Sequence, residues 1–225
     1  MRIRPVGAHA LLLDCTAPAD TPEAEAAFVE AWRAELWRRR ERGDLIAVEI
    51  VPAARTVLLD GLPDPATTTE QLTRWASTVA GARGAADLRD ATAEDGADDA
   101  AEVFVPVTFD GPDLAAVAEH WGVDVPAVRH KLTSTRFRVA FCGFAPGFPY
   151  LTGLPAELAL PRLATPRPRV PAGSVALAGP YAGIYPGASP GGWLLVGRTD
   201  LVLFDVAADP PARLGPGTTV RMVAA

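Results

Sequence analysis

The stretch CGFAPGFPYLTGLP (142–155), followed by PRLATPRPRVPAGSVALAGPYAGIYPGASPGGWLLVGRT (161–199), decides how this chain folds. Between positions 143 and 193, 19 of 51 residues are Gly or Pro. A disordered linker with that composition would be polar and poor in aromatics. This stretch instead carries six aromatic residues: Phe144, Phe148, Tyr150, Tyr181, Tyr185 and Trp193. It therefore predicts ordered turns around a rigid surface, a construction typical of loops that hold a functional site.

The charge and composition of the chain narrow its range of partners. The 225 residues carry a formal net charge of −6 and a pI of about 5.1. That charge argues against nucleic acid or an anionic membrane surface as the main partner. No stretch approaches the ~20 apolar residues of a membrane helix, and the apolar run 10–13 is too short for a signal-peptide core. We expect a cytoplasmic protein that does not associate with membranes.

Residues 1–80 predict a small α+β domain. A short apolar strand at 10–13 is followed by a helix that starts at Thr21-Pro22-Glu23. Two strand-like runs, 46–51 and 55–59, then precede a second helix with capping-box spacing at Thr67 and Glu70. The order β-α-β-β-α is typical of a ferredoxin-like sandwich.

The rest of the chain predicts a linker and a second domain. Residues 81–102 are rich in Ala and Asp without a clean apolar period, which predicts an exposed linker. Residues 103–225 begin with a strand and two short helices capped by Asp113 and Asp124. After them the pattern is short strands separated by Gly and Pro turns, which predicts a mainly β barrel or sandwich. The predicted strands are 103–109, 137–142, 174–178, 193–197, 201–206 and 219–223.

The general sequence motifs of enzyme chemistry are absent. There is no P-loop, no Gly-x-Gly-x-x-Gly opening a helix, no Cys-x-x-Cys and no Gly-x-Ser-x-Gly. The three histidines argue against a multi-histidine metal site, and Cys15 and Cys142 match no metal spacing. We therefore predict no metal site within the chain.

Arginines and aromatics within the Gly/Pro stretch are the first candidates for a binding site. Arginine suits bidentate recognition of a carboxylate or a phosphate. Four arginines lie in or beside the rigid loops: Arg162, Arg167, Arg169 and Arg198. Phe144 and Phe148 bracket Pro146-Gly147, and two aromatics across a tight turn often form one wall of a pocket.

The remaining candidates each have a structural alternative. Ser174 follows Pro171-Ala172-Gly173, where its hydroxyl either faces a ligand or satisfies the local backbone. Tyr185 and Trp193 either line a pocket or fill the barrel, and for Trp193 we favour the barrel core. His130 lies on a predicted helix, where a single histidine is either structural or a proton-transfer group.

These residues resemble the B-subunit family of the prokaryotic 5-oxoprolinase. That family is also known as the sporulation kinase inhibitor family and was long labelled allophanate hydrolase subunit 1. The resemblance covers nearly all of 103–225 and is only general over 1–80. Phe137, where the family often has Tyr, and the position near Cys142 depart from the pattern. The matching segments are Gly143-Phe144-x-Pro146-Gly147-Phe148-x-Tyr150-Leu151, Thr165-Pro166-Arg167-x-Arg169-Val170-Pro171-Ala172-Gly173-Ser174-Val175, Ile184-Tyr185-Pro186, Ser189-Pro190-Gly191-Gly192-Trp193 and Gly197-Arg198-Thr199.

The resemblance implies a fold and a set of partners. The second domain would be a cyclophilin-like β-barrel, preceded by the small α+β domain. The chain would act with a C subunit, similar to a biotin-dependent carboxyltransferase half, and with a separate A subunit. Together they would cleave the lactam 5-oxoproline to glutamate at the expense of ATP. The nucleotide, with its Mg²⁺, would be shared with the partner.

The resemblance also implies roles for individual residues. Phosphorylation of a lactam oxygen needs cations that neutralise the developing charge. Arg167, Arg169 and Arg198 would bind the substrate carboxylate or phosphate. Ser174 and Tyr185 would hydrogen-bond the lactam. His130 would transfer a proton or orient a reacting group. Grouped by role, the catalytic set is His130, Arg167, Ser174 and Tyr185, and the substrate-binding set is Phe144, Pro146, Phe148, Arg169 and Arg198.

The sequence leaves a second function open, from a different class. The family's alternative name implies a regulator that binds and inhibits a sensor histidine kinase, with a groove of the barrel as its docking surface. Prolyl isomerase activity is a third possibility that rests on fold analogy alone. Sequence reasoning does not choose among these functions, although the enzyme subunit is the interpretation we favour.

Overall fold

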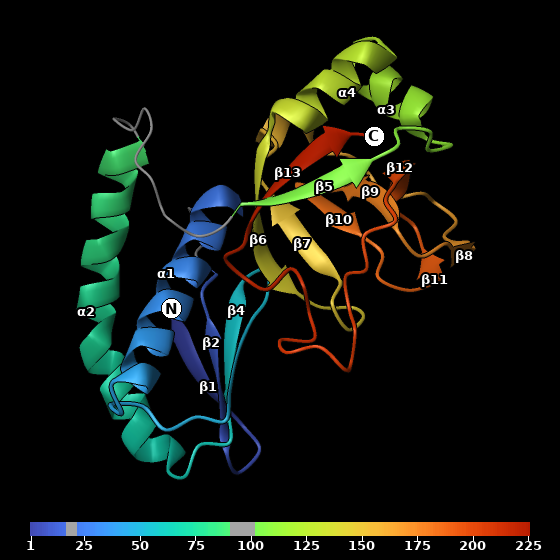
Figure 1. Ribbon diagram of the computed structural model, residues 1–225. Helices are drawn as coiled ribbons and strands as arrows, with labels where there is room; N and C mark the ends of the chain where they lie inside the picture. The colour runs from blue at the N-terminus through green and yellow to red at the C-terminus, as the bar shows by residue number, and fades with distance from the viewer. Residues whose placement is uncertain (17–21, 91–101) are drawn as a thin grey trace. The chain divides into compact units, whose positions relative to one another are not determined.

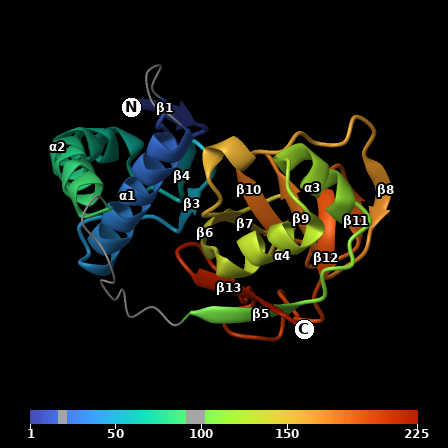
Figure 2. The ribbon, with the colours of Figure 1, turned by 90° about the horizontal axis from the view of Figure 1, so that it is seen from above.

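The structure is a computed structural model that describes residues 1–16, 22–90 and 102–225. The chain divides into two compact units, Met1–Asp98 and Asp99–Ala225. Figures 1 and 2 label the helices and strands of the two units where there is room.

The N-terminal unit is a four-stranded antiparallel sheet with both of its helices on one face (Figures 1 and 2). The strands follow the order β1-β2-β4-β3 across the sheet. Their bounds are Arg2–Val6 for β1, Ala10–Asp14 for β2, Glu49–Pro52 for β3 and Thr56–Asp60 for β4. The helices are α1 (Pro22–Glu41) and α2 (Pro65–Asp90).

The core of this unit follows the predicted apolar faces. Trp32 and Leu36 of α1 are fully buried against Leu13 and Val57 of the sheet. Strand β1 was not predicted, because its sequence RIRPV alternates charged residues with apolar ones and its side chains are mostly exposed. The unit is therefore α+β with one more strand than predicted. Its assignment as ferredoxin-like stays a prediction.

Helix α2 differs from the prediction at both ends. The carboxylate of Asp64, rather than Thr67, caps its start by accepting the backbone N–H groups of Ala66 at 3.0 Å and Thr67 at 3.2 Å. At its other end the helix continues to Asp90. The predicted linker 81–102 is therefore helical up to Asp90, and its residues 91–101 lie outside the described residues.

The second unit is built on a seven-stranded sheet that nearly closes into a barrel. Its order is β12-β9-β10-β7-β6-β13-β5, antiparallel except for β13 and β5. Just beyond β5, Thr108 exchanges two backbone hydrogen bonds of 2.9 Å with Arg198 of β12, so the two edge strands meet. The bounds are β5 Val103–Val107, β6 Arg136–Cys142, β7 Pro149–Thr152, β9 Ser174–Ala178, β10 Tyr181–Ile184, β12 Leu194–Arg198 and β13 Thr219–Ala224. The prediction of a mainly β barrel-like domain is confirmed.

Helices α3 (Leu114–Trp121) and α4 (Val125–Ser134) pack against this sheet (Figures 1 and 2). Val117 and Leu132 join the barrel's inner core, where Phe137 and Leu151 are fully buried. The predicted cap of α4 is confirmed, since Asp124 accepts the N–H of Ala127 at 2.8 Å. The predicted cap of α3 is wrong, because Asp113 makes no side-chain capping bond.

The Gly/Pro stretch contributes strands that its pattern did not reveal. Besides β7 and β10 it forms β8 (Arg167–Val170) and β11 (Ser189–Gly191), which pair as a separate two-stranded sheet, and a short 3₁₀ turn η1 (Ala156–Leu158). The strand predicted at 201–206 is wrong, since the backbone there forms only an isolated bridge between Phe204 and Ala212. Each of these strands is short, and Gly or Pro interrupts the alternation that predicts longer ones.

Candidate functional site

Aromatic side chains form a continuous group on the outer face of the barrel sheet, which we call the aromatic cluster. Its members are Phe141, Phe144, Phe148, Tyr150, Tyr181, Tyr185 and Trp193. The ring of Phe148 is central, with centroids 5.0 Å from Tyr185, 5.2 Å from Tyr150 and 5.5 Å from Trp193. Most of the pairs are edge-to-face, the geometry favoured by aromatic quadrupoles. The cluster is thus a tightly interlocked surface rather than a set of separate side chains.

Strand alternation places this cluster opposite the inner core. Val175 and Leu177 of β9 belong to the inner core, while Ala176 and Ala178 belong to the buried group around Phe148. Small residues under the rings make room for them. A Cβ at Gly183 of β10 would lie 2.9 Å from Trp193 and 3.0 Å from Phe148.

Phe144 is the exposed end of the cluster. Its side chain is 63% exposed, and its backbone has φ 69°, the only positive φ of a non-glycine residue among the described residues. Its ring lies 5.4 Å from Phe148 and 6.3 Å from Tyr185. A left-handed backbone costs a non-glycine residue roughly 1–2 kcal/mol. An exposed ring held at that cost is typical of a functional surface.

The turn that carries Phe144 is fixed by its neighbours. Gly147 has φ 73°, and a Cβ there would lie 2.8 Å from Phe204. Pro146 is exposed between them, and Phe148 is almost fully buried. The structure therefore brings together the rings of Phe144 and Phe148 across this turn, as the sequence predicted, while their role as one wall of a pocket stays a prediction.

The hydroxyls of Tyr150 and Tyr185 in the aromatic cluster stay protonated at neutral pH. Burial raises the pKa of Tyr150, and the positive charge of Arg162 opposes that rise. Burial and the nearby Tyr150 raise the pKa of Tyr185, against opposing effects of Arg162, Arg167 and a backbone hydrogen bond from Trp193. Both phenols are therefore hydrogen-bond donors under physiological conditions.

The guanidinium of Arg167 is bound by other residues of the chain rather than free. It donates to Asp113 at 2.7 Å and to the carbonyl of Trp193 at 3.3 Å. The second oxygen of Asp113 accepts the backbone N–H of Leu195 at 2.7 Å. The Asp113 carboxylate, predicted as a helix cap, thus joins α3, β8 and β12.

Neither of the other two predicted arginines makes a cation–π contact with the aromatic cluster among the described residues. Arg198, at the point where the barrel closes, pairs with Asp110 at 2.9 Å, and both side chains are about half exposed. Arg169 of β8 is exposed. Their predicted substrate contacts remain proposals.

Ser174 and Tyr185 are neighbours through the backbone. The carbonyl of Ser174 accepts the N–H of Tyr185 at 2.9 Å, and the N–H of Gly173 donates to the carbonyl of Tyr185 at 2.7 Å. Both residues are buried. The structure therefore places the predicted pair side by side at the end of β10.

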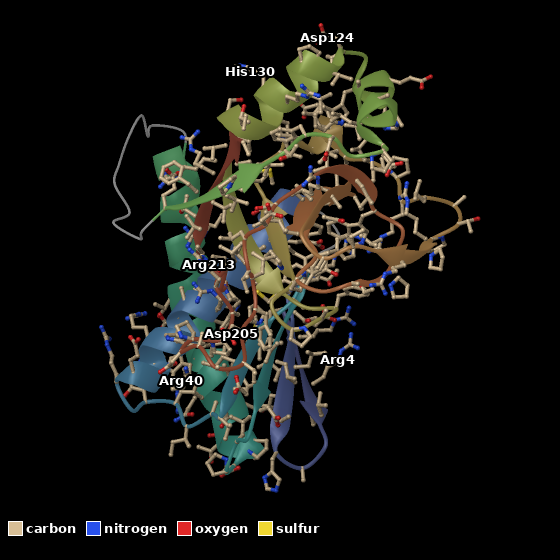
Figure 3. The ribbon with its side chains drawn as sticks, turned by 45° about the vertical axis from the view of Figure 1, so that its right-hand side comes forward. Arg4, Arg40, Asp124, His130, Asp205 and Arg213 are labelled. Atoms are coloured by element: carbon tan, nitrogen blue, oxygen red, sulfur yellow. The ribbon has the colours of Figure 1, made fainter. Side chains whose placement is uncertain are left out.

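His130 lies apart from the other predicted site residues. Its side chain is exposed on the outer side of α4 (Figure 3). The buried residues of the same helix, Val128 and Leu132, pack into the inner core, which is on the other side of the sheet from the aromatic cluster. The geometry of the described residues gives no support to a proton-transfer role in that cluster.

Sequence reasoning did not include Phe141, Tyr181 or Asp113 among the site residues. Phe141 stacks on Tyr150 with ring centroids 4.3 Å apart, and Tyr181 meets both rings at 5.6 Å. Alternation along β10 places Tyr181 opposite Ala182 and Ile184 of the inner core. Phe141 has the parity of Phe137 and Val139 and lies on the outer face because the strand pairing shifts between Val139 and Phe141, a change that alternation does not predict. The tertiary role of Asp113 had no signal in the sequence.

A bound metal or a membrane helix finds no support in the part of the chain that the structure describes. No group of three or more His, Cys, Asp or Glu side chains there could hold a metal ion. No described helix is both long and apolar enough to cross a bilayer.

Curated relatives share a single name. A protein of Escherichia coli O157:H7, named as the B subunit of 5-oxoprolinase, is 52% identical over 124 residues, which are 54% of this chain and 57% of that protein. A protein of Bacillus subtilis (strain 168) with the same name is 43% identical over 124 residues, 54% of this chain and 52% of its own length. The match thus spans little more than half the length of these curated relatives.

Solved structures agree with the fold. The crystal structure of the protein TTHA0988 superposes on the whole of this chain with a TM-score of 0.68 and 31% identity, and the match covers 40% of that longer chain. The urea amidolyase of K. lactis superposes on 99% of this chain with a TM-score of 0.66 and 20% identity, over 15% of its own length, which shows a shared fold alone. Residues 1–214 match the model of the family described as carboxyltransferase domain, subdomain C and D, and the chain belongs to this family.

Proposed function

We propose that this chain is a subunit of an ATP-dependent 5-oxoprolinase, which cleaves 5-oxo-L-proline to L-glutamate. It would act with a carboxyltransferase-like C subunit and a separate A subunit. The observation that carries the proposal is the 52% identity to the B subunit of 5-oxoprolinase of Escherichia coli O157:H7. Because the match covers 57% of that relative, the activity, the substrate and the partners come to this chain as proposals.

The aromatic cluster is the part of the chain that suits a lactam. 5-Oxoproline is a small flat ring with an amide on one side and a carboxylate on another. The exposed ring of Phe144 and the half-buried ring of Tyr150 offer flat apolar faces, and the phenol groups offer donors for the amide oxygen. Phe148, Tyr185 and Ser174 lie beneath and fix these positions. In this proposal the chain binds and orients the lactam and shields it from water.

In the proposed complex the nucleotide is shared with the partner subunit. The described residues assemble no cluster of metal-ligating side chains, and the sequence has no P-loop. We therefore assign ATP and Mg²⁺ to a site that the partner supplies or completes. The remaining predicted roles, substrate contact by Arg169 and Arg198 and proton transfer by His130, rest on the resemblance.

Coupled turnover tests the proposal. The chain is co-expressed with the C-type and A-type subunits from the same source, and glutamate release from 5-oxoproline is followed with and without ATP. We expect glutamate only when ATP and all three subunits are present. A complex that assembles but releases no glutamate would show that the substrate assignment is wrong.

A single substitution tests the part assigned to the aromatic cluster. Tyr150→Phe removes one hydrogen-bond donor and keeps the ring, so it should lower kcat/KM for 5-oxoproline. All three tyrosines of the chain lie in the cluster, so none of them can serve as a control. Arg136→Gln on β6, outside the cluster, is the control and should turn over as wild type.

A further inference from the structure

Of the four arginines of the Gly/Pro stretch, two form ion pairs with carboxylates of the chain and two do not. Arg167 is held by Asp113, and Arg198 is held by Asp110. The negative charge of a paired carboxylate offsets much of the attraction that a guanidinium exerts on a second anion. Arg162 and Arg169 are exposed, and neither pairs with a carboxylate among the described residues.

Arg162 alone of these two lies over the aromatic cluster. Its guanidinium carbon is 6.0 Å from the centre of the Trp193 ring, at the edge of cation–π range. Its charge also reaches both central phenols, since it lowers the pKa of Tyr150 and of Tyr185 against the effect of burial. Among the described residues, Arg169 makes no cation–π contact with the aromatic cluster.

A cation in this position matters for a charged ligand. A flat neutral ring needs only the aromatic surface and a hydrogen-bond donor. An unpaired guanidinium beside that surface adds a strong attraction for a carboxylate, which it can grip with two parallel N–H bonds. The side chain has lost little freedom to an internal partner, so it remains able to close onto a ligand.

We propose that Arg162 binds the carboxylate of the lactam and makes the site select acidic lactams over neutral ones of the same size. This inference rests on the proposed function, because it names the group that recognises that function's substrate. Arg167 then acts through the backbone of Trp193 as a positioning residue, while Arg162 provides the contact with the ligand.

Two measurements test the inference. The first is steady-state turnover by the complete complex, comparing the wild type with Arg162→Gln, Arg162→Lys and the control Arg136→Gln. The second is calorimetric binding of 5-oxoproline and of the neutral lactam 2-pyrrolidinone to the full chain. We expect Arg162→Gln to raise the KM for 5-oxoproline at least tenfold with kcat and the KM for ATP nearly unchanged. Arg162→Lys should recover part of the loss, and the control should behave as wild type.

The outcomes separate this inference from the proposed function. If the wild-type complex releases no glutamate but the chain prefers the acidic lactam and loses that preference in Arg162→Gln, the proposed function fails and the inference stands. If turnover is normal and Arg162→Gln leaves the KM and the preference unchanged, the inference is overturned. A rise in the KM for ATP alone would assign Arg162 to a nucleotide phosphate and would also overturn it. Absence of both turnover and binding in the wild type would overturn both.

Discussion

Removal of the Asp113 carboxylate should destabilise the barrel unit strongly, although Asp113 lies outside the aromatic cluster. Its two oxygens hold Arg167 at 2.7 Å and the backbone N–H of Leu195 at 2.7 Å, and its side chain is only 12% exposed. In Asp113→Ala the buried N–H loses its acceptor, at a cost of about 1–3 kcal/mol. The guanidinium of Arg167, 27% exposed, loses its partner, which adds about 1 kcal/mol after allowance for its contact with water.

The sum is about 3 kcal/mol of unfolding free energy. For a unit of this size each kcal/mol lowers the melting temperature by about 3–4 °C, so the expected shift is about 10 °C. Asp113→Asn separates the two contributions, because its amide oxygen still accepts from Leu195 while the ion pair is gone. It should lower the melting temperature by roughly a third as much.

Thermal unfolding followed by near-UV circular dichroism suits this measurement, since Trp193 and its neighbouring rings report on the site. A double-mutant cycle with Arg167→Met should give a coupling energy of about 1–2 kcal/mol between the two side chains. The reasoning is refuted if Asp113→Ala melts within about 2 °C of the wild type. Equal losses in the Asn and Ala variants would show that the Leu195 contact contributes nothing.

Three further predictions follow from single positions. Gly173→Ala should lower the free energy of unfolding in urea by at least about 3 kcal/mol, because the φ of Gly173 is +76° and a Cβ there would collide with the carbonyl of Thr199. Gly179→Ala is the matched control: with a φ of +55° and open space around the new Cβ, it should cost only about 1 kcal/mol. Phe144→Gly should be about 1 kcal/mol more stable than Phe144→Ala, because both variants lose the ring but only glycine accepts a φ of 69° without strain. Both variants should weaken 5-oxoproline binding equally in calorimetry. Equal stabilities of the two variants would show that the backbone at position 144 is not strained. Burial raises the pKa of the Cys15 thiol from 9.0 to about 12, so between these pH values the folded state keeps the thiol proton while the unfolded state loses it. The free energy of unfolding should therefore be complete below pH 9 and fall as the pH rises towards 12. Equilibrium unfolding at about pH 8 and about pH 10.5 measures this fall, and Cys15→Ala should lessen it.

Local sequence signals predicted most of the regular elements. Pro22 at the first position of α1 and Asp124 at the cap of α4 mark boundaries that the structure confirms, because a cap is satisfied within a few residues of chain. The strand at 174–178 was predicted with its observed bounds. The rings of Phe144 and Phe148 were predicted to lie together, since a single tight turn is enough to bring them together.

Signals that depend on distant residues were much harder to interpret. Asp113 stands where a helix cap is expected, yet its partners are Arg167 and Leu195, 54 and 82 positions further along the chain. Arg167 was the favoured catalytic cation because arginine suits anions, and the sequence could not show that a carboxylate already holds it. His130 was predicted to transfer a proton or orient a reacting group, but the face of a helix that packs inward is decided by which positions fit the barrel core.

The sequence therefore determined the local features: the caps, the tight turns, the aromatic content of the Gly/Pro stretch and the family to which that stretch belongs. Only the tertiary structure decided which arginines pair with a carboxylate, which arginine lies above the aromatic cluster and which rings share a face of the sheet. The physical reason is the range of the interactions involved. Turn and cap preferences act between residues a few positions apart, whereas ion pairs and ring packing depend on strands that meet only when the barrel closes, as Thr108 and Arg198 do.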